Sequence, residues 1–155
     1  MTKTYYEQLS DLNVDFFERA KISLLDPLGL YLANDVKWIK TNQNWNYLKF
    51  PVVIGGKGQP ILLLHGFDSS FLEFRRIYQS LKRNFQVIIP DLLGFGFSPR
   101  CAVNEYNPSK IISYLVDLLK TLEIKDNLKI IGASMGGSTA LKLAFEIPNS
   151  VDKII

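Results

Sequence analysis

Apolar and polar positions divide the chain into two parts near residue 45. In the first part, apolar side chains recur at helical spacing between residues 17 and 24, and Asp26-Pro27 is expected to end that helix. The stretch from Leu28 to Ile39 predicts a second short helix. We therefore expect residues 1–45 to form an N-terminal helical extension that lies on the main domain.

From residue 46 onward, short apolar runs alternate with segments of helical periodicity. The runs that predict buried strands are Leu48 to Ile54, Ile61 to Leu64, Gln86 to Ile89, Leu128 to Ile131 and a last one that begins at Val151. Pro51 indicates that the first of these strands lies at an edge of the sheet or is broken. The predicted helical faces are Phe74, Ile77, Tyr78 and Leu81, then Ile111, Leu115, Leu118, Leu119 and Leu122 after an N-cap at Asn107-Pro108, and finally Gly137 to Glu146.

Strands separated by helices of this length predict βαβ units, and therefore an α/β fold with a mostly parallel, twisted sheet and flanking helices. Right-handed crossovers bring the carboxyl ends of the strands to one edge, where open α/β sheets place their sites. His65, Asp91 and Ser134 each lie just past the carboxyl end of a predicted buried strand. We expect all three to lie along that edge of a domain spanning residues 46–155.

The composition fits one globular domain with a real core, since 47% of the 155 residues are hydrophobic and 21% are charged. The net charge is +3, without a block of like charges. Arg75-Arg76 and Lys82-Arg83 lie close together, but this spacing favours a solvated helix face over a nucleic-acid patch. We therefore expect no nucleic-acid partner.

The lone cysteine, Cys101, excludes an internal disulfide and suits a reducing cytoplasm. No signal peptide is evident, and no stretch has the roughly 18 apolar residues of a membrane span. The stretch from Phe16 to Leu32 is apolar enough to contact a membrane surface, but Asp26-Pro27 interrupts it and favours core packing or a cap role. No cluster of His, Cys and Asp has the spacing of metal ligands, so neither a metal nor another cofactor is expected.

The segment from Gly132 to Gly136 carries the clearest chemical signal, because Gly-Ala-Ser-Met-Gly fits the G-x-S-x-G motif. A predicted strand leads into it and a predicted helix follows, which is the context that a nucleophile elbow needs. The turn must hold the Ser134 hydroxyl clear of the backbone, and Gly132 and Gly136 remove the Cβ atoms that would clash. The alternative is an ordinary glycine-rich turn between a strand and a helix.

The segment His65-Gly66-Phe67 predicts the second half of a catalytic site. An acyl-transfer enzyme needs two backbone N–H groups aimed at the developing oxyanion. One normally comes from the residue after the nucleophile, here Met135, and the other from a loop after a neighbouring strand, here Phe67, with Gly66 permitting the turn. His65 is the only histidine, which makes it a candidate base. Its position before this loop favours a structural role instead.

The loop from Asp91 to Ser98 is rich in turns. Its Gly94-Phe95-Gly96 segment lacks the third glycine of a dinucleotide fingerprint and no helix opens there, so we expect no nucleotide. Asp91 is expected to bond backbone groups of this loop, and Ser98 to be structural.

Three segments together resemble the α/β-hydrolase fold family: Leu62 to Phe67, Pro90 to Ser98, and Gly132 to Gly137. Their order and spacing fit as well as their motifs, and the likeness covers residues 46–155. Within the family, the chain looks most like the serine-nucleophile branch of esterases and C–C hydrolases, close to epoxide hydrolases, with an HGF-type oxyanion loop. Epoxide hydrolases and haloalkane dehalogenases carry aspartate at the elbow, so serine argues for ester, thioester or related acyl hydrolysis.

The resemblance implies that Ser134 is the nucleophile and that the N–H groups of Phe67 and Met135 form the oxyanion hole. Family members place an acid and then a histidine on later loops, and that arrangement is missing after Ser134 in this sequence. We therefore expect a serine hydrolase for a small-molecule acyl substrate, truncated before the last strands and inactive or weakly active alone.

Two alternatives stay open. The chain can be a non-catalytic remnant or interaction module, whose open sheet edge pairs with a complementing C-terminal chain or with a second copy. Alternatively, His65 can serve as an improvised base.

Overall fold

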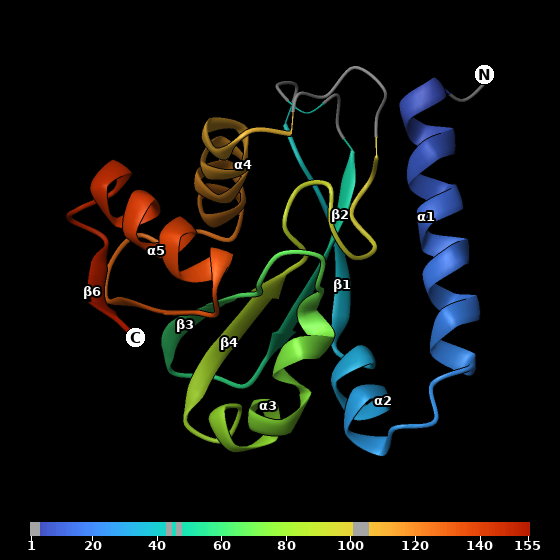
Figure 1. Cartoon of the computed structure of the whole chain (residues 1–155), viewed down its shortest axis with the longest axis horizontal. Helices are drawn as coiled ribbons and strands as arrows, with labels where there is room; N and C mark the ends of the chain where they lie inside the picture. The colour runs from blue at the N-terminus through green and yellow to red at the C-terminus, as the bar shows by residue number, and fades with distance from the viewer. Residues whose placement is uncertain (1–3, 43–44, 46–47, 101–105) are drawn as a thin grey trace.

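Figure 1 shows the computed structural model of the chain, in which residues 4–42, 45, 48–100 and 106–155 are described. Cys101 lies outside these ranges. The elements, in chain order, are α1 (Tyr5–Ile22), α2 (Pro27–Ala33), β1 (Val36–Lys40), β2 (Lys49–Gly55), β3 (Gln59–Leu64), the 3₁₀ helix η2 (Phe71–Phe74), α3 (Arg75–Leu81), β4 (Phe85–Pro90), α4 (Pro108–Thr121), β5 (Leu128–Gly132), α5 (Met135–Glu146) and β6 (Val151–Ile154). None of the helices within the described ranges is long and apolar enough to cross a membrane.

The described strands form one six-stranded sheet in the order β1-β2-β4-β3-β5-β6. Neighbouring strands from β4 to β6 pair in parallel, whereas β2 pairs antiparallel with both β1 and β4. The predicted mostly parallel α/β sheet with flanking helices is therefore confirmed. The β3–β5 register pairs Leu64 with Gly132, so these two strands end side by side.

Two apolar clusters cover the two faces of this sheet. Alternate residues of the central strands, such as Leu62 and Leu64, pack in a cluster with α4 and α5. Their neighbours Ile61 and Leu63 pack in the other cluster, with α1, α2 and α3. Because both faces are covered, every residue from Ile61 to Leu64 is buried, and this explains the continuous apolar run there.

The N-terminal segment is only partly helical. α1 begins with a capping box between Thr4 and Glu7, and Asp26 caps α2. The second helix predicted for Leu28 to Ile39 is wrong beyond Ala33, because residues 36–40 form β1 and pair with β2. Lys37 is exposed between two partly buried apolar neighbours, which is the alternation of a strand. The domain boundary at residue 45 stays a prediction, although β1 joins the same sheet as the later strands.

Pro51 lies in an interior strand, so the prediction of an edge or broken strand is wrong. Its carbonyl accepts a hydrogen bond from the Asp91 N–H at 3.3 Å, so its polar groups point toward the β4 side. The bond that an N–H at residue 51 would give to the Asp91 carbonyl is replaced, because that carbonyl accepts from the Ser98 hydroxyl at 2.9 Å.

The helix predicted from Phe74 to Leu81 forms, but one residue of its predicted apolar face is exposed. Phe74 and Tyr78 are buried, whereas Ile77 is 42% exposed. The 3₁₀ turn of η2 precedes α3, which begins only at Arg75, so the 3.6-residue spacing does not hold from Phe74 onward.

Candidate active site

The backbone at Ser134 forms a sharp turn between β5 and α5. Its φ of 52° and ψ of −117° lie in a region that residues other than glycine rarely occupy. Gly136 N–H donates to the Ala133 carbonyl at 2.8 Å and Gly137 N–H to the Ser134 carbonyl at 2.9 Å, which closes the first turn of the helix. Ser134 is exposed, and its hydroxyl bonds no other described residue. Such strain and exposure are typical of a nucleophile elbow.

The two motif glycines are required by the close approach of α5 to the strands. A Cβ atom at Gly136 would lie 1.9 Å from the Leu64 carbonyl oxygen. A Cβ atom at Gly132 would lie 2.5 Å from the Gly136 carbonyl oxygen. Because these neighbours are backbone atoms, they cannot move aside as a side chain would, and the turn needs glycine at both positions.

The loop after β3 lies against this turn. A Cβ atom at Gly66 would be 3.4 Å from the Ser134 Cβ, so the sheet brings these two predicted site residues together. The Gly66 N–H donates to Glu73 Oε2 at 2.9 Å and is therefore not free to bind another acceptor. The N–H groups of Phe67 and Met135 donate to no other residue that the structure describes. These two N–H groups are therefore free to bind another acceptor, as the donors of an oxyanion hole must be.

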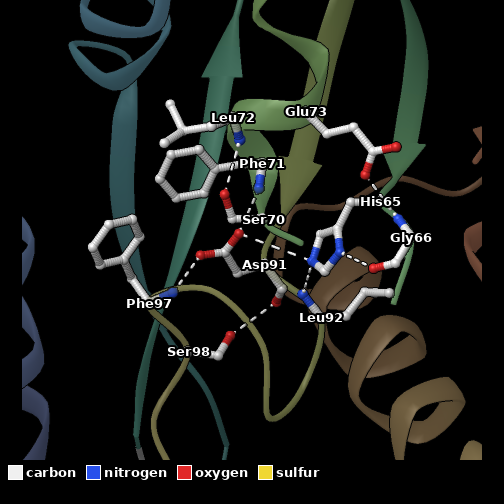
Figure 2. Close-up of polar contacts among 10 residues, drawn as sticks. All are labelled: His65, Gly66, Ser70, Phe71, Leu72, Glu73, Asp91, Leu92, Phe97 and Ser98. Carbon is white, nitrogen blue, oxygen red and sulfur yellow. Dashed lines mark hydrogen bonds and ion pairs between the residues drawn. The ribbon is translucent and has the colours of Figure 1, made fainter. Parts of the chain in front are cut away.

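His65 is fully buried and uses both ring nitrogens (Figure 2). Nε2 accepts a hydrogen bond from the Leu92 N–H at 2.9 Å, so the ring proton belongs on Nδ1, which lies 2.8 Å from the Gly66 carbonyl oxygen. Burial lowers the pKa of His65 and favours this neutral form. The imidazole thus ties the loop after β3 to the loop after β4, and it has no nitrogen left to accept a proton from Ser134.

The Asp91 carboxylate joins the same two loops from the other side of His65 (Figure 2). Its Oδ1 accepts from the Phe71 N–H and its Oδ2 from the Phe97 N–H, both at 2.6 Å. The Ser98 hydroxyl donates to the Asp91 carbonyl at 2.9 Å. Burial raises the pKa of Asp91 to about 7, against the opposing effect of these N–H donors. Asp91 thus bonds backbone groups and, being fully buried, does not reach solvent.

Two further residues contact the predicted site, and the sequence did not single them out. Glu73, in η2, holds Gly66 through the bond described above. The Phe95 ring lies 6.0 Å from the His65 ring and 5.4 Å from the exposed ring of Phe67.

Ser70 caps η2 through the Leu72 N–H, and a serine just before the helix is the one local signal that predicts this turn.

An open hollow of about 750 Å³ borders the loop after β3. Its walls come from α1, from the segment after Phe67 and from the loop after β4, and they include Phe16, Asp68, Ser69, Glu73, Phe97 and Arg100. The hollow offers both charges and aromatic surface beside the predicted oxyanion loop. Within the described ranges, no three His, Cys, Asp or Glu side chains gather in a way that could hold a metal ion.

Comparison with known proteins places this geometry in a family. Residues 59–155 match the description of the alpha/beta hydrolase fold. The 2-hydroxymuconate semialdehyde hydrolase of Pseudomonas sp. (strain CF600) is 34% identical over 103 residues, which cover 64% of this chain and 36% of that protein. Lipase 1 of Psychrobacter immobilis is 35% identical over 97 residues, which cover 63% of this chain and 30% of that protein.

The same relationship holds among solved structures. A meta-cleavage product hydrolase from Pseudomonas fluorescens IP01 aligns with a TM-score of 0.69 at 27% identity, over 76% of this chain and 43% of that one. The chain spans about a third of the length of the two curated relatives. The family match covers more than half of the chain and includes the four strands from β3 to β6 with the turn at Ser134. The chain belongs to the α/β-hydrolase fold family.

Proposed function

We propose that this chain carries the nucleophile and the oxyanion hole of a serine hydrolase that acts on a carboxylic ester or a similar acyl substrate. The observation that carries the proposal is the exposed Ser134 at a strained turn, with the loop of Gly66 packed against it. The relatives named as a semialdehyde hydrolase and a lipase support hydrolysis as the class of reaction. The cytoplasmic location expected from the composition stays a prediction.

In this proposal, Ser134 Oγ attacks the substrate carbonyl carbon. The N–H groups of Phe67 and Met135 then stabilise the negative oxygen of the tetrahedral intermediate. One such donor typically contributes about 10² to 10³ in rate. Glu73 and His65 position the loop that supplies one of these donors, because each bonds Gly66 directly.

The proton transfers need a base that these residues do not supply. His65 is the only histidine of the sequence, and both of its nitrogens are engaged in hydrogen bonds. We therefore propose that a histidine outside these 155 residues activates Ser134. Without a base, a serine hydrolase retains residual catalysis of roughly 10³ to 10⁴ over the rate in water.

Ester hydrolysis with added imidazole tests the nucleophile. The rate for a p-nitrophenyl ester should be low with the purified chain alone and should rise with imidazole concentration, whereas for Ser134→Ala the rise with imidazole should be only that of free imidazole. Ser138→Ala, which changes another exposed serine four residues later, is the matched control and should behave as the wild type. Equal rates for the wild type and Ser134→Ala at every imidazole concentration would contradict the proposed nucleophile.

The same experiment tests whether the base lies outside these 155 residues. Robust turnover without imidazole, lost in Ser134→Ala, would mean that the chain does contain a base. A His65→Gln variant, checked for folding by circular dichroism, would then show whether His65 is that base.

A second candidate function rests on the open edge of the sheet at β6. Phe145 is 86% exposed and Ile155 is 66% exposed near this edge, beside a hollow of about 470 Å³ lined by residues of α5 and β6. An uncovered parallel edge strand invites pairing. The chain would then be an interaction module that binds a complementing C-terminal polypeptide or a second copy. A compact, non-associating monomer in light scattering over a wide concentration range would count against it.

A further inference from the structure

One end of the molecule exposes aliphatic side chains that no other described element covers. Ile22, the last residue of α1, is 86% exposed, and Leu25, in the turn before α2, is 96% exposed. Leu28 follows on α2 at 40%. We call these three residues the apolar tip. Figure 1 shows the end of α1, the turn, α2 and α3 together at the lower end of the view.

Basic side chains gather at the same end. Residues 18–37 and 75–83 contain seven basic side chains against three acidic ones: Arg19, Lys21, Lys37, Arg75, Arg76, Lys82 and Arg83 against Glu18, Asp26 and Asp35. These two segments therefore carry more positive charge than the chain as a whole, whose net charge is +3. The positive charge is concentrated at this end of the molecule.

The ion pairs at this end leave most of its cations unpaired. Asp26 binds Arg75, and Asp35 binds Lys82. The five remaining cations form no ion pair with a residue that the structure describes: Arg19, Lys21, Lys37, Arg76 and Arg83. Most of the nearby negative charge is thus already neutralised, whereas the unpaired cations remain available to an anionic partner.

The apolar tip is held in place by its surroundings. The Asp26 side chain caps α2 by accepting the Leu28 N–H at 2.9 Å, and it also accepts from Arg75 Nε at 2.5 Å. The Ser23 N–H closes the end of α1 on the Ala20 carbonyl at 3.0 Å. The turn between the helices is therefore fixed on both sides, and it presents Leu25 outward.

We propose that this end of the molecule docks on an anionic phospholipid bilayer. The apolar tip would enter the boundary between headgroups and acyl chains, and the five unpaired cations would face the headgroups. Apolar insertion together with basic flanks is the combination that gives stable peripheral binding. A second copy is the less suitable occupant, because two such ends would bring like charges together.

Docking in this way would leave the site around Ser134 free. Ser134 follows the carboxyl end of β5, whereas α3, which belongs to the docking end, leads into the amino end of β4. This inference does not rest on the proposed hydrolase activity, since it concerns a different end of the chain.

Vesicle co-sedimentation of the purified full chain tests the proposal. The chain should sediment with phosphatidylcholine vesicles that contain a quarter phosphatidylglycerol, should bind pure phosphatidylcholine much more weakly, and should dissociate as salt is raised. The double variant Ile22→Ser/Leu25→Ser should lower binding to the mixed vesicles by about tenfold. Arg76→Gln and Arg83→Gln should each lower it by about fivefold.

Matched controls separate the proposal from its rivals. Phe145→Ser removes an apolar side chain as exposed as Ile22, but on α5, and should bind as the wild type. Equal binding by the tip variant, or binding that is insensitive to phosphatidylglycerol, would overturn the proposal. A dimer in light scattering that the tip variant loses, without any vesicle binding by the wild type, would assign the surface to a second copy and overturn it too.

Discussion

Gly136 and Gly137 are neighbours in the first turn of α5, yet their surroundings differ. A Cβ atom at Gly136 would lie 1.9 Å from the Leu64 carbonyl oxygen, whereas a Cβ atom at Gly137 would lie 3.5 Å from the Gly132 carbonyl oxygen. Gly136→Ala should therefore lower the free energy of unfolding by more than about 2 kcal/mol, because only a backbone shift relieves the clash. Gly137→Ala should be neutral or stabilise by up to about 1 kcal/mol, since alanine favours the helix.

Urea unfolding of both variants and the wild type, followed by circular dichroism, checks this difference. Equal stability of the two variants would mean that α5 does not press against β3 at Gly136, and the close packing of the elbow would have to be abandoned.

Asp91 links stability to pH. Burial raises its pKa to about 7 in the folded chain, above the roughly 3.9 of an unfolded aspartate. Between those values the folded state holds a proton that the unfolded state has released, so the contribution of Asp91 to stability falls as pH rises from about 4 to about 7. Above about pH 7 both states are ionised and the full cost of the buried charge is present.

The Asp91→Asn variant isolates this effect because asparagine does not titrate. The free energy of unfolding of the wild type minus that of Asp91→Asn should be larger at pH 5.5 than at pH 8, measured by urea unfolding at both pH values. His65 is present in both proteins, so its titration largely cancels in the difference. A difference that stays constant or grows with pH would show that the carboxyl remains ionised at pH 5.5.

At the scale of elements, α4 packs on the sheet through an unusual tyrosine. The Tyr114 ring lies 4.5 Å from the Phe50 ring, and its buried hydroxyl has no hydrogen-bond partner among the described residues. Tyr114→Phe should therefore leave the free energy of unfolding unchanged or raise it by up to about 1 kcal/mol. Tyr78→Phe is the matched control: its hydroxyl donates to Asp35 Oδ2 at 2.5 Å, and its loss should cost about 1–3 kcal/mol. Thermal unfolding distinguishes the two, and an equal loss in both variants would reveal a partner for Tyr114.

The elements that the sequence predicted well are those whose apolar pattern reports burial directly. The run from Ile61 to Leu64 is buried because both sheet faces are covered, and Asn107 caps α4 through the Lys110 N–H as expected. β1 was missed because its five residues directly follow a capped helix in an apolar stretch. The prediction for Pro51 was wrong because the donor that replaces its missing N–H at the Asp91 carbonyl is the hydroxyl of Ser98, which lies in another part of the chain.

The candidate site was predictable only in part, for a related reason. Ser134 and its glycines form a local motif, so their turn could be expected from five consecutive residues. The contacts that support the loop after β3 are not local. Asp91 reaches Phe71 twenty positions away, and Glu73 reaches Gly66 only because η2 folds back on the strand end. No periodic pattern encodes such contacts.

At the scale of the whole molecule, the two ends of the fold have different surfaces. The edge at the carboxyl ends of the strands carries Ser134 and the loop of Gly66, whereas the end formed by α2, α3 and the turn after α1 carries the apolar tip and unpaired cations. A face beside β6 is also uncovered. Hydrolysis, lipid contact and pairing with another chain are thus proposed for three separate surfaces, each open to its own test.

The most direct test of the central claim is the intact mass of the purified chain after exposure to a fluorophosphonate probe in the presence of imidazole. We expect a single adduct on the wild type and on Ser138→Ala, and none on Ser134→Ala. That result would mean that Ser134 is reactive and that the elbow and oxyanion loop are assembled. No adduct on a chain shown to be folded, or an adduct that survives in Ser134→Ala, would contradict the assignment of Ser134 as the nucleophile.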